Sequence, residues 1–279
     1  RRLGDERGVA LLAAGSLATW SPHFGSDLDI IAVAADERST PRKDAIIHAL
    51  LDDARAMRLG PIDLRLRGEG KSAPLVQTLD YYESYFQTRA SLWEIIAYSK
   101  CRFIRGDAET GRAFEEMLAR TLPVLFSREG WKERLLETRA KLESLSKGAW
   151  DVKHAAGGLY DIGFLLSAAR LLGLLGPAVP AVQTGRREEL ERLREAGLLE
   201  AGDPATLLGA YRVFWTIEHA AALHGIPYPP SSGRENFFES YFGRLFGDIV
   251  KGEGTFLGRL EGLKRDVREI FDRFLERTA

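Results

Sequence analysis

The stretch "AAGSLATWSPHFGSDLDIIAVAAD", residues 13–36, decides the predicted fold, because it joins two short apolar segments through a polar connection. The first apolar segment ends in Gly15-Ser16, and the second begins with Asp27-Leu28-Asp29. Short apolar runs that are bounded by turn residues favour β-strands over helices. The polar residues between the two strands fit either a surface hairpin or a site that binds a phosphate chain with its metal ions.

The segments around this stretch predict a small sheet followed by helices. Short apolar runs and period-two alternation predict strands over 9–15, 29–35, 62–68 and 101–107. Apolar residues at helical spacing predict helices over 42–57, 79–100 and 256–274, and every segment after about residue 107 has a helical pattern. The fold class is therefore α+β: a small mixed-sheet domain over residues 1–110, followed by an all-α helical bundle over residues 111–279.

Composition narrows the class of protein. The chain has 279 residues, of which 45% are hydrophobic and 28% charged, and its net charge of −1 lacks the basic excess of a dedicated nucleic-acid binder. Its single cysteine, Cys101, excludes an intrachain disulfide and fits a reducing, cytoplasmic location. Arg170, Pro177 and Pro180 interrupt the most apolar region, which favours a buried helix over a membrane span. Neither nucleic acid nor membrane is expected as a partner.

Two carboxylates open the second predicted strand. Asp27 and Asp29 are two residues apart, so their side chains are expected on the same face of the strand. Like charges at that distance repel unless a cation lies between them, and Mg²⁺ prefers oxygen ligands. Taken alone, such a pair slightly favours a solvated strand end over a metal site.

A third acid changes this interpretation. Asp63 lies on the strand predicted over 62–68, whose alternation places Arg65 and Arg67 on the face of Asp63. If this strand neighbours the one that carries Asp27 and Asp29, three carboxylates and two guanidinium groups converge. Carboxylates that hold two metal ions, with arginines that offset phosphate charge, are what phosphoryl or nucleotidyl transfer requires. We therefore interpret the three aspartates as catalytic and metal-binding.

The remaining candidates would bind the nucleotide. Gly15 permits close approach of a phosphate to backbone N–H groups, and Ser16 adds a hydroxyl group. Lys71 fits a phosphate-binding role and a solvated loop position about equally well. The candidate nucleotide-binding residues are Gly15, Ser16, Ser26, Arg65, Arg67 and Lys71.

The order Gly-Ser, about ten residues, Asp-x-Asp and a distant third Asp resembles the polymerase-beta-like nucleotidyltransferase superfamily. More specifically, residues 63–107, 150–166 and 190–225 resemble glutamine synthetase adenylyltransferases. That resemblance implies a nucleotidyltransferase catalytic domain over residues 1–110, ATP as substrate with two Mg²⁺ ions, and transfer of AMP to a tyrosine of glutamine synthetase or a related acceptor. The family enzyme has two catalytic halves, one that attaches AMP and one that removes it. This chain resembles a single half, and its sequence is more similar to the attaching half.

The chain departs from the family pattern at two places. The family usually has Gly-Lys-Leu-Gly-Gly-Arg-Glu after the first strand, whereas this chain has "GSLATWSPHFG" at 15–25. The family usually has Asp-Ile-Glu-Phe where this chain has Asp-Ile-Gly-Phe at 161–164. These departures keep two alternatives open: a non-catalytic regulatory module that binds nucleotide or protein, and a small-molecule nucleotidyltransferase.

Overall fold

The computed structural model describes residues 8–37, 40–56, 61–64, 66, 74–175, 185–229, 235–246, 250 and 254–278. The chain divides into two compact units. The sheet unit comprises Arg1–Pro22, Ser26–Glu129 and Arg170–Thr184, and the helical unit comprises His23–Gly25, Gly130–Ala169 and Gly185–Ala279. The boundary between functional domains at residues 110 and 111 stays a prediction.

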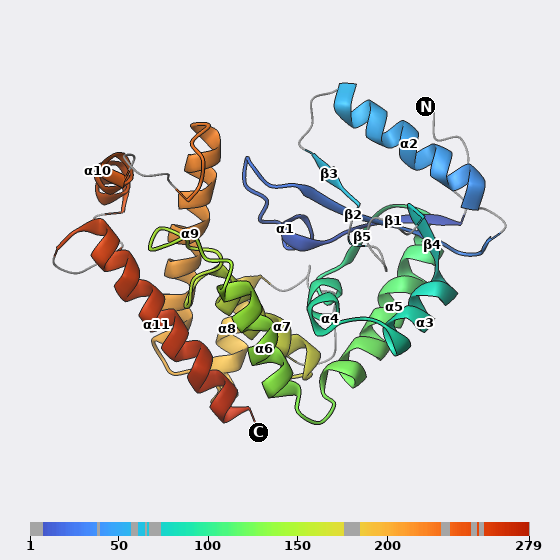
Figure 1. Ribbon diagram of the computed structural model, residues 1–279. Coiled ribbons are helices and arrows are strands. Elements are labelled where there is room, and N and C mark those ends of the chain that lie inside the picture. Colours follow the sequence, from blue (N-terminus) through green and yellow to red (C-terminus); the bar gives the residue numbers. More distant parts are fainter. Residues whose placement is uncertain are drawn as a thin grey trace. The chain divides into compact units, whose positions relative to one another are not determined.

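The sheet unit is built on a mixed sheet, as predicted; the sheet has five strands, of which β4 was not predicted (Figure 1). Strand β1 is antiparallel to β2 and to β5, whereas β3 and β4 run parallel to β2. The strand order is β3-β2-β1-β5, and β4 also pairs with β2. The strands are β1 (Val9–Ala13), β2 (Leu28–Ala34), β3 (Ile62–Asp63), β4 (Val76–Thr78) and β5 (Arg102–Gly106).

Helices cover both faces of this sheet, which explains why β2 is apolar at successive positions. On one face, Ile30, Ala32 and Ala34 pack with Ile47 of α2 (Thr40–Ala56). On the other face, α5 (Ala108–Phe126) packs on β1 and β5 (Figure 1). A strand that is buried on both faces has no solvent-facing positions to fill with polar residues.

The helix predicted over 79–100 is wrong as a single helix. The structure has α3 (Leu79–Thr88) and α4 (Leu92–Tyr98) instead. Ser91 starts the second helix with a capping box: its backbone N–H donates to the Glu94 carboxylate at 2.9 Å, and its hydroxyl accepts the Glu94 N–H. These local hydrogen bonds end the apolar periodicity that favoured one continuous helix.

The strand predicted over 62–68 is also shorter than expected, because β3 contains only Ile62 and Asp63. Leu64 and Leu66 are not part of a strand, and the other residues of 62–68 lie outside the described part of the chain. The first strand ends at Ala13, and a one-turn helix that was not predicted, α1 (Gly15–Ala18), follows it.

The helical unit confirms the helical pattern expected after residue 107. Helix α9 packs against α8 and α11, and α10 packs against α11. The elements are α6 (Trp131–Glu143), α7 (Leu159–Leu171), α8 (Arg186–Glu195), α9 (Asp203–Leu223), α10 (Glu235–Leu245) and α11 (Phe256–Arg277).

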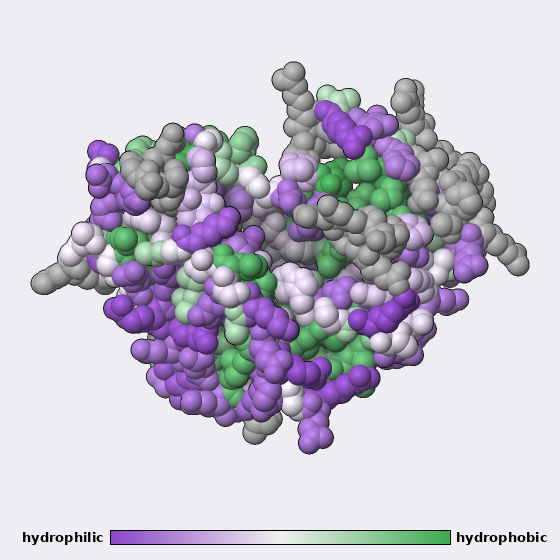
Figure 2. Space-filling view, viewed as in Figure 1, coloured by the Kyte–Doolittle hydropathy of each residue, from purple (hydrophilic) through white to green (hydrophobic). Residues whose placement is uncertain are grey.

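Within the described residues, no helix has both the length and the apolar composition that crossing a bilayer requires. Helix α7 covers the start of the apolar region at 163–182, and residues 176–182 of that region lie outside the described part. On the face drawn in Figure 2, hydrophobic side chains gather in separate patches between hydrophilic ones.

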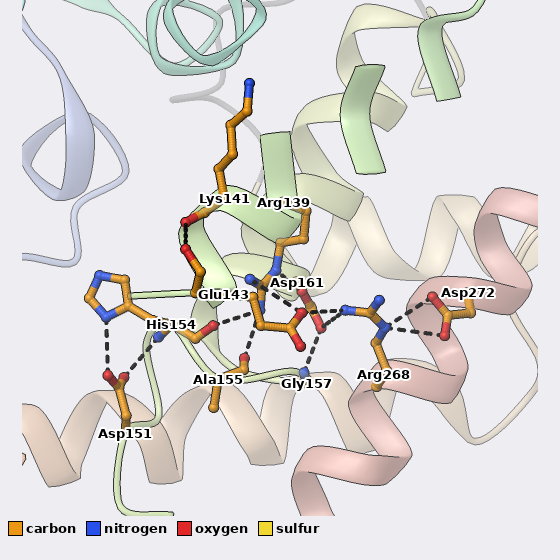
Figure 3. Close-up of polar contacts among 11 residues, drawn as sticks. Arg139, Lys141, Glu143, Asp151, His154, Ala155, Gly157, Asp161, Arg268 and Asp272 are labelled. Carbon is orange, nitrogen blue, oxygen red and sulfur yellow. Dashed lines mark hydrogen bonds and ion pairs between the residues drawn. The ribbon is translucent and has the colours of Figure 1, made fainter. Parts of the chain in front are cut away.

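A buried ion pair joins α6 to α7 (Figure 3). Arg139 and Asp161 are at most 1% exposed, and the Arg139 Nε donates to Asp161 Oδ1. The same guanidinium donates to the carbonyl oxygens of His154 at 3.0 Å and Ala155 at 2.6 Å. Arg268 of α11 lies 3.4 Å from the other oxygen of Asp161. Burial raises the pKa of Asp161, and the two guanidinium groups oppose that rise.

Gly157 is required at the turn before α7. Its φ is +72°, and a Cβ there would lie 1.7 Å from the Lys264 carbonyl oxygen of α11. Its N–H donates to Asp161 Oδ2 at 2.6 Å. The glycine therefore allows the turn to touch α11 while satisfying the buried carboxylate.

We expect Asp161→Asn to lower the free energy of unfolding by about 3 to 5 kcal/mol, because it removes the buried counter-charge of Arg139 and leaves only Glu143, which is 38% exposed and 3.8 Å away. The matched control is Asp272→Asn, which removes a partly exposed partner of the same Arg268. That change should cost less than about 1 kcal/mol. Urea unfolding of both variants measures the difference, and equal losses would contradict the importance of the buried pair.

Asp107 anchors the start of α5 to the start of β1. Its carboxylate accepts N–H groups from Thr110 and Gly8, each at 2.9 Å. These backbone hydrogen bonds, that from Gly8 first, hold the pKa of Asp107 below its usual value.

Because the folded-state pKa of Asp107 is depressed, its contribution to stability is present above about pH 4 and is lost as the pH falls through the folded pKa. Asp107→Ala should therefore cost about 1 kcal/mol at neutral pH and less in acid. Glu109→Ala, in the same helical turn, is the control. A difference between wild type and Asp107→Ala that stays constant with pH in urea titrations would refute this linkage.

Candidate active site

Asp29 and Asp63 lie side by side in the sheet. Strands β2 and β3 are parallel, and their register pairs Asp29 with Asp63. In-register residues of neighbouring strands share a face of the sheet. Leu64 and Ile30, the next residues along each strand, pack in the core on the α2 side, so the two aspartates face the opposite side. Both aspartates are half-buried.

The Gly15 backbone lies directly against the Asp29 carboxylate. Its φ is +53°, and a Cβ built on it would lie 2.1 Å from Asp29 Oδ2. The neighbouring Ala14 N–H donates to the Asp29 carbonyl oxygen at 2.9 Å. Ser16 follows as the second residue of α1 and is half-buried. The Gly15-Ser16 turn and the two aspartates therefore form one locus.

Arg102 is a residue of this locus that sequence reasoning missed. It is 7% exposed, and its Nε and Nη2 donate to the carbonyl oxygens of Ala18 at 2.9 Å and Leu17 at 3.1 Å. Its guanidinium carbon lies 3.8 Å from the centroid of the Trp20 ring, within cation–π distance. Burial lowers the pKa of Arg102, and the Glu115 carboxylate opposes that shift. Its sequence signal is weak, because the same strand carries a second arginine, Arg105.

Cys101 also lies near Asp29, and its thiol is buried. Burial raises the pKa of its thiol well above the usual value, and the Asp29 carboxylate raises it further. A thiol of this kind stays protonated at neutral pH and is neither a nucleophile nor a metal ligand.

Of the other predicted site residues, the structure describes Ser26 and Asp27. Ser26 and Asp27 precede β2, and Asp27 is exposed. The predicted residues Arg65, Arg67 and Lys71 lie outside the described part of the chain. Among the described residues, no three His, Cys, Asp or Glu side chains are grouped so that they could hold a metal ion. A shared metal site of Asp27, Asp29 and Asp63 stays a prediction.

The Asp29–Asp63 pair nevertheless fits magnesium chemistry. Mg²⁺ in phosphate-transfer sites is commonly bound by one or two carboxylates, with waters and substrate phosphates as its remaining ligands. Two carboxylates in register on neighbouring strands supply that number of protein ligands. The missing side chain of Gly15 leaves room for the Asp29 carboxylate itself, which lies where a Cβ would stand.

Comparison with known families gives two matches. Residues 1–117 match the family model for glutamate-ammonia ligase adenylyltransferase. Residues 128–226 match the family model for GlnD PII-uridylyltransferase. The two matches cover consecutive parts of the chain. The names of both families describe the transfer of a nucleotidyl group.

Curated relatives agree with the first match. Proteins named bifunctional glutamine synthetase adenylyltransferase/adenylyl-removing enzyme are similar over most of the chain. The one from Methylococcus capsulatus is 28% identical over 97% of this chain and 30% of its own length. Those from Aromatoleum aromaticum and Xanthomonas campestris pv. campestris are each 31% identical, over 80% and 77% of this chain. The chain spans less than a third of the length of these relatives. The resemblance to the adenylyltransferase family is thereby confirmed.

Gly15→Ala should displace the Asp29 carboxylate, because the new methyl group would occupy the position of one carboxylate oxygen. The matched control is Gly225→Ala, at φ +61° with no atom within 4 Å of the added Cβ. Both changes should cost about 1 kcal/mol of stability from the left-handed backbone conformation. Only the first should move Asp29, which a crystal structure or the carboxyl ¹³C shift would reveal; an unmoved carboxylate would contradict the close approach.

Proposed function

Because the chain is a relative of the glutamine synthetase adenylyltransferases, we propose that it is a nucleotidyltransferase that moves AMP from ATP to a protein hydroxyl group. The proposed acceptor is a tyrosine of glutamine synthetase or of a related protein, and a cytoplasmic location fits the single cysteine. The observation that supports the proposal most directly is the register of Asp29 with Asp63 beside the Gly15 backbone.

In the proposed reaction, the acceptor oxygen forms a bond to the α-phosphorus of ATP, and the bond from that phosphorus to pyrophosphate breaks. Two Mg²⁺ ions held by Asp27, Asp29 and Asp63 would supply positive charge to the phosphates and to the acceptor oxygen. A tyrosine hydroxyl has an ordinary pKa near 10. Asp63 is the candidate that accepts its proton, since a positioned carboxylate can act as general base.

The remaining candidates would hold the nucleotide in place. The backbone N–H groups and hydroxyl of Gly15-Ser16 are proposed to bind the β- and γ-phosphates. Ser26, Arg65, Arg67 and Lys71 are proposed to offset further phosphate charge or donate hydrogen bonds to it. The carboxylates of Asp27, Asp29 and Asp63 repel one another. We therefore expect these three side chains to come together only when ATP binds with the cations that they share.

The proposed function and its two alternatives, a small-molecule nucleotidyltransferase and a regulatory module, predict different outcomes of one assay. Incubation with labelled ATP, Mg²⁺ and glutamine synthetase should label the protein band if the chain is a protein adenylyltransferase. A labelled small molecule would identify the second class of nucleotidyltransferase, and binding without turnover would identify a regulatory module. The relatives are named for both attachment and removal of AMP, so adenylylated glutamine synthetase with pyrophosphate or phosphate should be assayed in parallel.

Asp29→Asn and Asp63→Asn should each lower the rate of AMP transfer at least about a hundredfold, because each removes a negative charge that the reacting phosphates and their cations require. Their thermal midpoints should equal or exceed that of wild type, since repulsion between neighbouring carboxylates is relieved. Asp36→Asn, just beyond the far end of β2, is the matched control and should transfer AMP normally. Full activity in either site variant would refute these roles.

A further inference from the structure

The segment that carries Gly15 is held only in part by local hydrogen bonds, such as those from the Ala18 N–H to the Ala14 carbonyl oxygen and from the Thr19 hydroxyl to the Ser16 carbonyl oxygen. Helix α1 has only four residues, and its N-cap, Ala14, offers no side-chain hydrogen bond. A single helical turn is unfavourable by itself, because fixing the first turn costs more backbone entropy than its hydrogen bonds return. Trp20, just after the turn, has a φ of +53°, which is uncommon for a residue with a side chain. Its ring is nevertheless 69% exposed.

Arg102 supplies support from a neighbouring strand. Its backbone pairs with Ala13 of β1, two residues before Gly15. Its side chain donates to the carbonyl oxygens of Leu17 and Ala18, just after Gly15. One residue therefore holds the chain on both sides of the close approach to Asp29. A cation at the carbonyl end of a helical turn also interacts favourably with the backbone dipoles.

Burial of the Arg102 guanidinium should lower the stability of the fold, so it requires interactions that compensate it. Arg102 is 7% exposed, and the Glu115 carboxylate opposes the effect of this burial on its pKa. A desolvated cation is destabilising unless hydrogen bonds and opposite charge compensate it. Two carbonyl groups and the face of Trp20 compensate it in part. A polyanion bound at the adjacent turn would add further negative charge near the guanidinium.

We propose that Arg102 is a positioning residue for the polyphosphate of ATP, an inference that rests on the proposed function. It fixes the Gly15 backbone against the Asp29 carboxylate, and this sets the space in which the Asp29–Asp63 pair receives the β- and γ-phosphates. Arg102 acts through the turn and touches no reacting atom. Its loss should therefore weaken binding of ATP more than binding of AMP, which has no β- or γ-phosphate.

The first test compares Arg102→Met and Arg102→Lys with Arg105→Met, an exposed arginine on the same strand. In the presence of Mg²⁺, Arg102→Met should raise the Kd for ATP at least tenfold and the Kd for AMP less than twofold. Arg102→Lys should be intermediate, since an ammonium group donates to carbonyls but lacks the planar fork. Arg105→Met should bind both nucleotides like wild type. A ratio of ATP to AMP affinity that equals that of Arg105→Met would overturn the proposal.

The second test needs no activity. The Ala18 N–H donates to the Ala14 carbonyl oxygen and the Ser21 N–H to the Ser16 carbonyl oxygen, each at 3.0 Å. In Arg102→Met these two amides should exchange with deuterium faster than in wild type. The Ala14 N–H, bonded to the Asp29 carbonyl oxygen, is the internal control and should be unchanged. Unchanged exchange at Ala18 and Ser21 would overturn the positioning role.

The two tests separate the inference from the proposed function. If Arg102→Met does not fold, Arg102→Lys decides by the same ratio and the same amides. If wild type neither binds ATP nor transfers AMP, the proposed function and the inference fall together. If wild type does both, while both Arg102 variants match Arg105→Met, only the inference falls.

Discussion

The sheet unit depends on the close contact between the Gly15 backbone and the Asp29 carboxylate. Any side chain at residue 15 would take the position of a carboxylate oxygen. The antiparallel register of β1 with β2, which pairs Ala13 with Ile30, brings the two residues together. The strand that follows Asp29 must then be apolar, because helices cover it on both faces. Strand β2 therefore begins at the site and continues into the core, which explains why Asp27 and Asp29 come directly before an apolar run.

The helical unit contains a cluster of buried polar residues, and this cluster explains much of the amino-acid sequence at 150–166. Asp151 is 1% exposed and accepts N–H groups from Lys147, Lys153 and His154 at 2.8 to 3.1 Å. The Arg139–Asp161 pair lies close to the same loop and fixes its carbonyl groups (Figure 3). These contacts give the aspartates of this segment a structural role, since buried carboxylates need several hydrogen-bond donors.

Sequence patterns predicted those parts of the fold whose signal extends over many residues. The strands near residues 9–15 and 29–35 are apolar runs bounded by turn residues, the helix from Phe256 has a long apolar repeat, and the structure confirms all three. The break before α4 is encoded by Ser91 and Glu94, but the apolar periodicity on both sides of it favours continuity. Strand β3 is held by pairing with β2 and not by its own two residues. Arg102 could not be interpreted, because its carbonyl partners lie 84 and 85 residues away in the chain.

Strands β3 and β4 pair with β2 at two places, Asp63 opposite Asp29 and Val76 opposite Ala32. The two attachment points are therefore three residues apart along β2, roughly 10 Å at the usual rise of a strand. The pairing of Asp29 with Asp63 thus involves only β2 and β3, and Val76 of β4 adds a separate attachment to the same strand.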